Sequence, residues 1–387
     1  MSYAAIILGL CQFLFMSSVA VGLAFNALVG KSLAPSAALA TLPLFFMMGG
    51  TAALTLSMPG VLARWGYRKV FMAGVLCGAL GGLFAVIANF FHSFWVFCVA
   101  GLMMGFYQAS AMYYRFAAAD AVAAEHKSSA IAWVLNGGIL AAFAGPLIGS
   151  HSLHFFAIDY VGSYAATALL ALLALPLLMR VPLPPRNAGV VLPDFNFKSI
   201  NFTALSAMLF CTSGYAMMGM VMLASPLAMS GCGYHPQDAA SVIQWHLLGM
   251  FAPSLVTGKL IARFGAQKIA LTGVVILLSG CALALTGTTL HIFHFALLIV
   301  GIGWNFMYMG GSTLLTFISD AGLRSRLQSI NEFATFSCIT LISGLTGWLY
   351  ESLGWQVILY IAVTLLTAVL AGILVGQIRQ PGIAKNN

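Results

Sequence analysis

The segment LARWGYRKVFMAGV (Leu62–Val75) returns later in the chain as IARFGAQKIALTGV (Ile261–Val274). Each copy is a short basic turn followed directly by an apolar run, and corresponding positions such as Ala63 and Ala262 are 199 residues apart. Other identities in register include Arg64, Gly66, Lys69 and Gly74, with their counterparts in the second copy. A basic turn next to an apolar run is typical of the loop that joins two membrane-spanning helices.

The composition indicates that the chain is surrounded by lipid. Of its 387 residues, 61% are hydrophobic and 6% are charged, and the mean hydropathy is +1.00. Soluble domains carry roughly 25% charged residues, so a soluble fold with this composition would lack a polar surface. A spanning helix needs about 20 apolar residues, and the chain divides into about twelve such runs. We predict spans at Ala4–Gly30, Ala37–Leu62, Val70–Phe91, Phe94–Ala119, Ser129–Ser150, Tyr160–Met179, Phe202–Met229, Ala240–Ala262, Ile269–Leu290, Phe293–Ser319, Leu327–Tyr350 and Gln356–Gln377.

The positions of the basic residues predict the orientation. With both termini in the cytoplasm, Lys31 is the one residue among the 16 Lys and Arg that lies outside. The reverse orientation would break the positive-inside rule. The net charge of +8 therefore reports membrane orientation, and no nucleic-acid surface is expected because the basic residues are spread over short loops. The first apolar run shows no cleavage pattern and is kept as the first span.

The offset of 199 residues extends beyond the quoted turn, since it also carries His92 to His291. A polar segment rich in proline, RVPLPPRNAGVVLPDFNFKSIN, separates the two copies. We predict an all-α integral membrane protein with two six-helix bundles, residues 1–180 and 202–387, joined by a cytoplasmic linker at residues 181–201. Transporters built from internal repeats have this organisation, with the substrate site near the middle of the membrane between the repeats.

The repeated turn and one later segment carry a family resemblance. PGVLARWGYRK (Pro59–Lys69) matches much of the pattern G-x-L-a-D-R-x-G-R-R, although Pro59 replaces its first glycine and Ala63 its acid, and GGILAAFAGPLIG (Gly137–Gly149) contains G-P-x-x-G. With the twelve spans and the central linker, these patterns resemble the major facilitator superfamily, in which G-P-x-x-G is frequent among exporters of drugs and metabolites. The resemblance implies a secondary active transporter that works by alternating access and lines its central cavity with spans 1, 4, 7 and 10.

Polar and aromatic side chains on these four spans are the candidate substrate contacts. Span 1 carries Gln12 and Asn26 on one face, and the repeat maps this face onto the face of span 7 that carries Tyr215. A polar side chain without a partner is costly in lipid, and buried Tyr and Trp tips need hydrogen bonds. The same residues can also serve as interhelical hydrogen bonds or as an aromatic packing cluster. We predict a site for a small, flat organic solute at Gln12, Asn26, Tyr107, Tyr215, Trp304, Asn305 and Tyr308.

Three titratable residues are candidates for proton coupling or gating. In VIQWHLLGM (Val242–Met250), His246 is the one histidine placed deep in a span, and histidine changes its charge most readily near neutral pH. Glu332 is the one acid placed inside a span, where carboxylates are usually functional. Arg115 lies at a similar depth in the other bundle, so we expect the two charges to pair when the cytoplasmic side closes. The alternatives are a structural hydrogen bond for His246, local bonding for Glu332, and snorkelling of Arg115 to the membrane surface.

No enzymatic or metal-binding pattern accompanies these features. VGKS (Val29–Ser32) lacks the first glycine of a phosphate-binding loop, which Phe25 replaces. The seven cysteines form no C-x-x-C pair, and no residues have metal-ligand spacing. We therefore expect neither a metal nor a cofactor, and no enzyme.

The sequence predicts a monomeric, proton-coupled transporter of the cytoplasmic (inner) membrane that moves a small organic solute. Export of drugs or metabolites, siderophores included, is favoured by the G-P-x-x-G motif. Uptake of a nutrient such as a vitamin or a chelate fits the polar tenth span and the altered basic loop, so the direction stays open. A non-transporting receptor or membrane enzyme would need a sensing domain or a catalytic cluster, and the loops are too short for the former. A channel fits a doubled six-helix plan less well.

Overall fold

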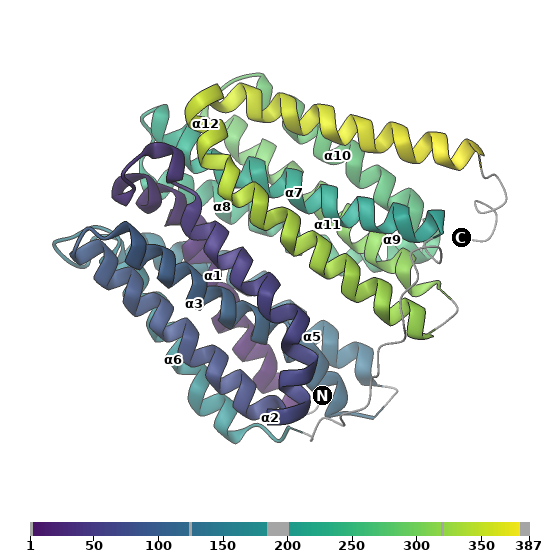
Figure 1. The fold of residues 1–387 in the computed structure, drawn as a ribbon, viewed down its shortest axis with the longest axis horizontal. Helices are drawn as coiled ribbons and strands as arrows, with labels where there is room; N and C mark the ends of the chain where they lie inside the picture. The colour runs from purple at the N-terminus through teal and green to yellow at the C-terminus, as the bar shows by residue number, and fades with distance from the viewer. Residues whose placement is uncertain (1–2, 124–125, 184–200, 319–320, 380–387) are drawn as a thin grey trace.

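The computed structural model describes residues 3–123, 126–183, 201–318 and 321–379, and within these ranges it contains helices and no strands (Figure 1). The helices are α1 (Tyr3–Leu33), the 3-10 helix η1 (Ala37–Leu39), α2 (Leu42–Phe90), α3 (Phe94–Ala111), α4 (Tyr114–Asp120), α5 (Lys127–Ser152), α6 (Val161–Arg180), α7 (Phe202–Gly231), α8 (Pro236–Phe251), α9 (Ser254–Phe264), α10 (Ala266–Leu285), α11 (Leu290–Thr316) and α12 (Ala321–Arg379). In the described residues, 11 helical stretches are long and apolar enough to cross a membrane. The predicted all-α membrane fold is confirmed.

Two glycines with positive φ divide the longest helices. α2 turns at Gly66 (φ 74°) and α12 turns at Gly354 (φ 79°), a conformation that glycine adopts without a clash. One apolar stretch of α12 covers 53 residues, and its helix would be about 80 Å long if straight. A bilayer core is about 30 Å thick. This stretch therefore crosses twice, and the 11 stretches agree with the twelve predicted spans.

The repeated turn has the same backbone feature in both copies. Gly265, the counterpart of Gly66, has φ 89° and joins α9 to α10. Each copy reverses the chain within a few residues between two packed helices, and only glycine enters this conformation without strain. The sharp turn thus explains why glycine recurs at an offset of 199 residues.

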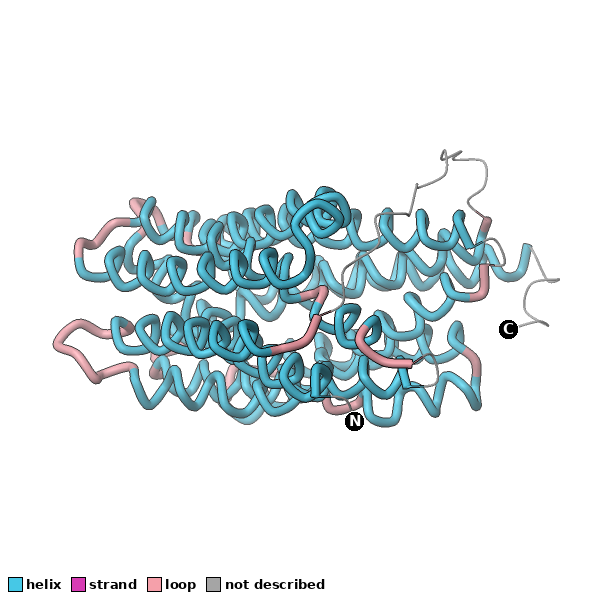
Figure 2. Tube along the Cα trace, turned by 90° about the horizontal axis from the view of Figure 1, so that it is seen from below, coloured by secondary structure: helices cyan, strands magenta, loops and turns pink. Residues whose placement is uncertain are grey.

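The helices form two groups, with α1–α6 in the lower part of Figure 1 and α7–α12 in the upper part. Figure 2 shows helices lying side by side along the long axis. Within the first group α2 packs against α3 and α6, and α1 packs against α5; within the second, α11 packs against α7, α8 and α10. α2 contacts α12 and α5 contacts α8 between the groups. The boundary at residues 181–201 stays a prediction, because residues 184–200 lie outside the described ranges.

One end of the molecule holds hydrogen bonds between the two groups of helices. We term it the far end; it is formed by residues 31–41, 151–160, 232–236 and Gly354, and both termini lie toward the opposite, terminal end (Figure 1). Among the described residues, hydrogen bonds that join the groups on this side run from Gln237 to His154 (3.0 Å), from the Gly347 amide to Thr41 (2.9 Å) and from the Gln244 amide to the Phe143 carbonyl (3.4 Å). The far end is therefore closed in this conformation.

Candidate substrate site

Four aromatic rings from three helices form a cluster in the second group. Trp304 and Tyr308 are one helical turn apart on α11, so their rings stack, with centroids 5.2 Å apart and planes inclined by 12°. Tyr215 of α7 stands edge-on to both, at 5.3 Å and 6.1 Å. Phe336 of α12 lies 6.0 Å from Tyr215. Tyr215 and Tyr308 are only half-buried, so this cluster offers aromatic surface to a ligand.

A carboxylate lies beside the stacked rings. The Tyr308 hydroxyl donates to Glu332 Oε1 at 2.8 Å. The other carboxylate oxygen, Oε2, is buried without a hydrogen-bond partner among the described residues, and so is Trp304 Nε1. A polar atom left unpaired in this way costs about 1–3 kcal/mol. The cluster therefore combines flat apolar surface with one buried acceptor and one buried donor that have no partner among the described residues.

Arg115, in the first turn of α4, brings a positive charge from the first group of helices. It lies close enough to interact electrostatically with the Tyr308 hydroxyl, and its guanidinium lies 4.8 Å from the Phe116 ring centroid. Its Nε is buried and has no partner among the described residues. Arg115 and Glu332 form no ion pair within 4.0 Å in the described part of the chain. The gating prediction concerns a state closed at the terminal end, so it stays a prediction.

Asn305 lies on α11 next to the cluster but faces elsewhere, because successive helical residues are about 100° apart. Its amide nitrogen donates to the Met250 carbonyl (2.8 Å) and to Ser254 Oγ (2.7 Å), and its oxygen accepts from Thr257 (2.8 Å). These partners surround Pro253, where α8 ends and α9 begins. The structure thus places Asn305 at a helix break and does not bring it to the aromatic rings.

The candidates from the first group make contacts within that group. The Asn26 oxygen accepts from the Tyr164 hydroxyl at 2.8 Å, beside a cavity of about 30 Å³ within the first group. Tyr107 is fully buried, with its ring edge-on to Phe15 at 5.0 Å. Gln12 is half-buried on α1, where α5 approaches closely. Their role in binding stays a prediction, whereas Tyr215, Trp304 and Tyr308 are brought together.

His246 is fully buried between α8 and α11. Its Nδ1 lies 2.7 Å from the Leu297 carbonyl, which can only accept, so Nδ1 carries the hydrogen. Its Nε2 has no partner among the described residues. The bond to Leu297 fits a structural histidine, and the part of His246 in proton coupling stays a prediction.

The sequence does not predict the hydrogen bond between Tyr308 of the aromatic cluster and Glu332. The sequence predicts Glu332 as a proton-coupling residue and Tyr308 as a substrate contact, yet the two share a hydrogen bond, and Phe336 lies beside Tyr215 in the same cluster. Glu332 and Phe336 are four residues apart and so lie on one face of α12. This spacing of four residues is the sequence signal that predicts a carboxylate and an aromatic ring on one face of the helix.

The comparisons with known proteins identify the family. No family model matches the chain. It is 36% identical over 375 residues to the riboflavin transporter RfnT of Brucella anthropi, covering 94% of this chain and 93% of that protein. It is 24% identical to the MFS-type transporter YdeG of Bacillus subtilis, covering 93% of this chain and 87% of that protein. The chain belongs to the major facilitator superfamily.

Solved structures of other transporters share the fold. A point mutant of the nucleoside transporter NupG matches with a TM-score of 0.73 at 15% identity, covering 96% of this chain and 99% of that one. A bacterial homologue of the human lysosomal transporter Spinster matches with a TM-score of 0.71 at 16% identity, covering 97% and 96%. This superfamily member is a multi-pass membrane transporter of a small molecule, and its relatives are transporters rather than enzymes, as predicted.

Proposed function

We propose that this transporter carries a flat heteroaromatic solute of the riboflavin class. The observation that carries the proposal is the stacked pair of Trp304 and Tyr308, with Tyr215 edge-on to both. Aromatic side chains bind planar rings by stacking, which contributes about 1–3 kcal/mol per ring for nucleic-acid bases. RfnT, with 36% identity, is a riboflavin transporter, and riboflavin is a planar ring system with a polar chain.

The polar atoms around the rings support a solute that also forms hydrogen bonds. Trp304 Nε1 and Arg115 Nε are donors, Glu332 Oε2 is an acceptor, and none has a partner among the described residues. Each costs about 1–3 kcal/mol while unpaired. A heterocycle with donors and acceptors on its rim removes this cost, whereas a hydrocarbon of the same shape does not.

We also propose proton coupling, a monomer, and termini in the cytoplasm. Glu332, the one acid that the sequence places inside a span, accepts one hydrogen bond, and its other carboxylate oxygen has no partner among the described residues. Carboxylates in this setting are usually functional. Among the Lys and Arg of the described residues, Lys31 is the one at the far end, which supports an external far end. The His246→Gln variant tests whether His246 also takes part in proton coupling. If transport by the variant still follows a pH gradient as in the wild type, His246 has only a structural role.

Export of a similar flat compound is the second candidate, favoured by the G-P-x-x-G segment. However, a Cβ added at Gly145 would lie 2.5 Å from the Ala20 side chain and 2.8 Å from the Ser17 carbonyl. Close packing of α5 on α1 therefore already accounts for this glycine.

The test uses the purified full chain, first with riboflavin in a thermal-shift assay and then in liposomes. A ligand that binds only the folded state raises the Tm, and we expect riboflavin to do so. Liposomes with the protein should exchange riboflavin faster than empty liposomes, and an imposed pH gradient should change the rate. The sign of that change separates uptake from export. The absence of both a Tm shift and riboflavin exchange would overturn the proposal.

A further inference from the structure

Arg115 and Glu332 each carry a buried polar atom, a donor and an acceptor, that has no partner among the described residues. They come from different groups of helices, and both lie near Tyr308, through its hydrogen bond to Glu332 and its electrostatic interaction with Arg115. They do not pair with each other within 4.0 Å. Charges in a membrane interior are costly unless paired. A group that bridges the two would relieve both.

The hydrogen bonds already present limit which atoms remain for a ligand. Tyr308 occupies Oε1 of Glu332, so Oε2 is the free acceptor. Arg115 can only donate, and its buried Nε is unpartnered among the described residues. The complementary edge therefore carries an N–H beside a carbonyl oxygen, in the plane of a ring that stacks on the aromatic cluster.

We propose that Arg115 and Glu332 recognise the imide edge of a heterocycle, in which a ring N–H lies between two carbonyl groups. Glu332 Oε2 accepts from the ring N–H, and Arg115 donates to an adjacent carbonyl. This inference rests on the proposed function and deepens it, because the ring system of riboflavin ends in such an imide. Tyr308 is a positioning residue, since its hydroxyl orients the carboxylate.

Other ligand edges fit these two residues less well. A ligand carboxylate would pair with Arg115 but would be repelled by Glu332, and an amine would meet the opposite conflict. A neutral imide satisfies both charges and carries none. A ring with a methyl group on the imide nitrogen still stacks, but it leaves Glu332 Oε2 unpaired.

The experiment compares riboflavin with 3-methylriboflavin, which lacks only that N–H, by equilibrium binding to the purified full chain. We expect the methyl compound to bind the wild type about 10- to 100-fold more weakly, the scale of one unpaired buried polar group. In Glu332→Ala the two compounds should bind with similar, weakened affinity. Arg115→Met should weaken both by the same factor, because both keep the carbonyl groups. Glu351→Gln, an exposed carboxylate near the far end, is the matched control and should change neither.

The outcomes separate the two proposals. Equal affinity of the wild type for the two flavins overturns the imide inference and leaves the proposed function standing, and this comparison needs no variant to fold. If riboflavin does not bind, the proposed substrate class falls. The imide inference is then decided by comparing the binding of uridine, which carries the same imide edge on a smaller ring, with that of 3-methyluridine, which lacks the N–H. Equal binding or no binding of that pair overturns it.

Discussion

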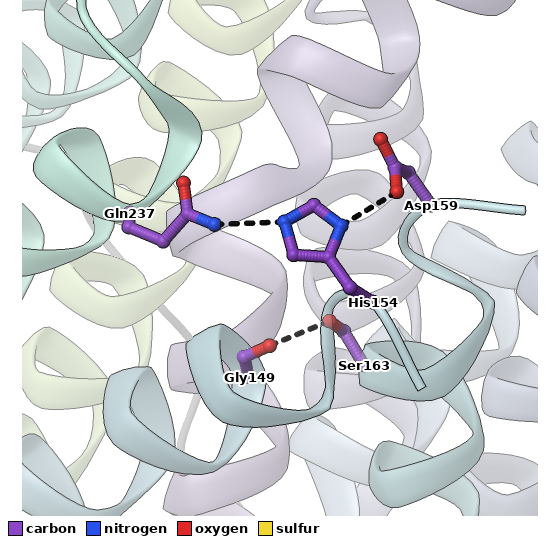
Figure 3. Close-up of polar contacts among 5 residues, drawn as sticks. All are labelled: Gly149, His154, Asp159, Ser163 and Gln237. Atoms are coloured by element: carbon purple, nitrogen blue, oxygen red, sulfur yellow. Dashed lines mark hydrogen bonds and ion pairs between the residues drawn. The ribbon is translucent and has the colours of Figure 1, made fainter. Parts of the chain in front are cut away.

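The far end and the substrate site treat polar side chains in opposite ways. At the far end, His154 Nδ1 lies 2.7 Å from Asp159 and Nε2 lies 3.0 Å from the Gln237 amide nitrogen, so both ring nitrogens are satisfied (Figure 3). At the site, Arg115 Nε and Glu332 Oε2 have no partner among the described residues. One region is complete within the protein, and the other has unpaired polar atoms that, in our proposal, a ligand satisfies.

This difference indicates which contacts hold the present conformation. His154 and Gln237 belong to different groups of helices, so their bond is lost when the far end opens. Only contacts that differ between two states bias the equilibrium between them. The far-end bonds therefore favour the closed far end, and we propose that the unpaired groups at the candidate site interact with the substrate instead.

The largest expected effect is at the aromatic cluster. Trp304→Ala removes one ring of the stacked pair. We expect the free energy of riboflavin binding to become less favourable by about 2–3 kcal/mol, the upper range for stacking on one aromatic side chain. Isothermal titration calorimetry on the purified variant measures this. Trp348→Ala on α12, an exposed Trp, is the control. A Trp304→Ala variant with wild-type affinity would reduce the cluster to packing.

Asn305→Ala should give an effect of a different kind, of about 2 kcal/mol, since it leaves several buried polar partners unsatisfied. Because Asn305 joins α11 to the break between α8 and α9, we expect a lower Tm and an unchanged riboflavin Kd. Thermal unfolding followed with and without ligand separates the two effects. Weakened binding at wild-type stability would return Asn305 to the substrate site.

Asn305 also shows where prediction from the sequence ends. The composition and the repeated turn predicted the membrane fold, because apolar length and backbone conformation at Gly66 and Gly265 are local properties. The sequence predicts that Tyr215, Trp304 and Tyr308 share a site, because the family resemblance places their two spans along one cavity and the last two residues are one helical turn apart; the structure brings the three rings together.

The partners of single polar residues could not be predicted in the same way. A helical pattern gives the face on which a side chain lies but not the neighbouring helix that this face meets. Asn26 therefore turned out to bond Tyr164 within the first group. The bonds of Asn305 depend on acceptors that become available only because the helix breaks at Pro253.

Tyr308→Phe gives a smaller expected effect, because it keeps the ring and removes only the hydrogen bond to Glu332. A hydrogen bond to a charged group contributes about 1.5–3 kcal/mol when both partners are buried, and we expect about 1–1.5 kcal/mol in riboflavin affinity because Tyr308 is half-buried. The discrimination against 3-methylriboflavin should shrink at the same time, since the carboxylate is no longer oriented. Discrimination equal to the wild type would show that the Tyr308 hydroxyl does not position Glu332.

The smallest expected effect is at the far end, where Gln237→Ala removes one bond between the groups of helices. The His154 and Asp159 side chains are each 61% exposed, and contacts this exposed contribute about 0–1 kcal/mol. The closed state should therefore lose at most about fivefold in population, and riboflavin affinity should change less than in any site variant.

Spin labels on Cys232, which is exposed, and on a cysteine at exposed Phe155 report the separation of the two groups. We expect a broader distance distribution with a longer mean in Gln237→Ala. Gln328→Ala, which changes an exposed glutamine near the terminal end, should leave the distribution unchanged. Identical distributions for all three proteins would mean that the contacts of α2 with α12 hold the far end closed without His154.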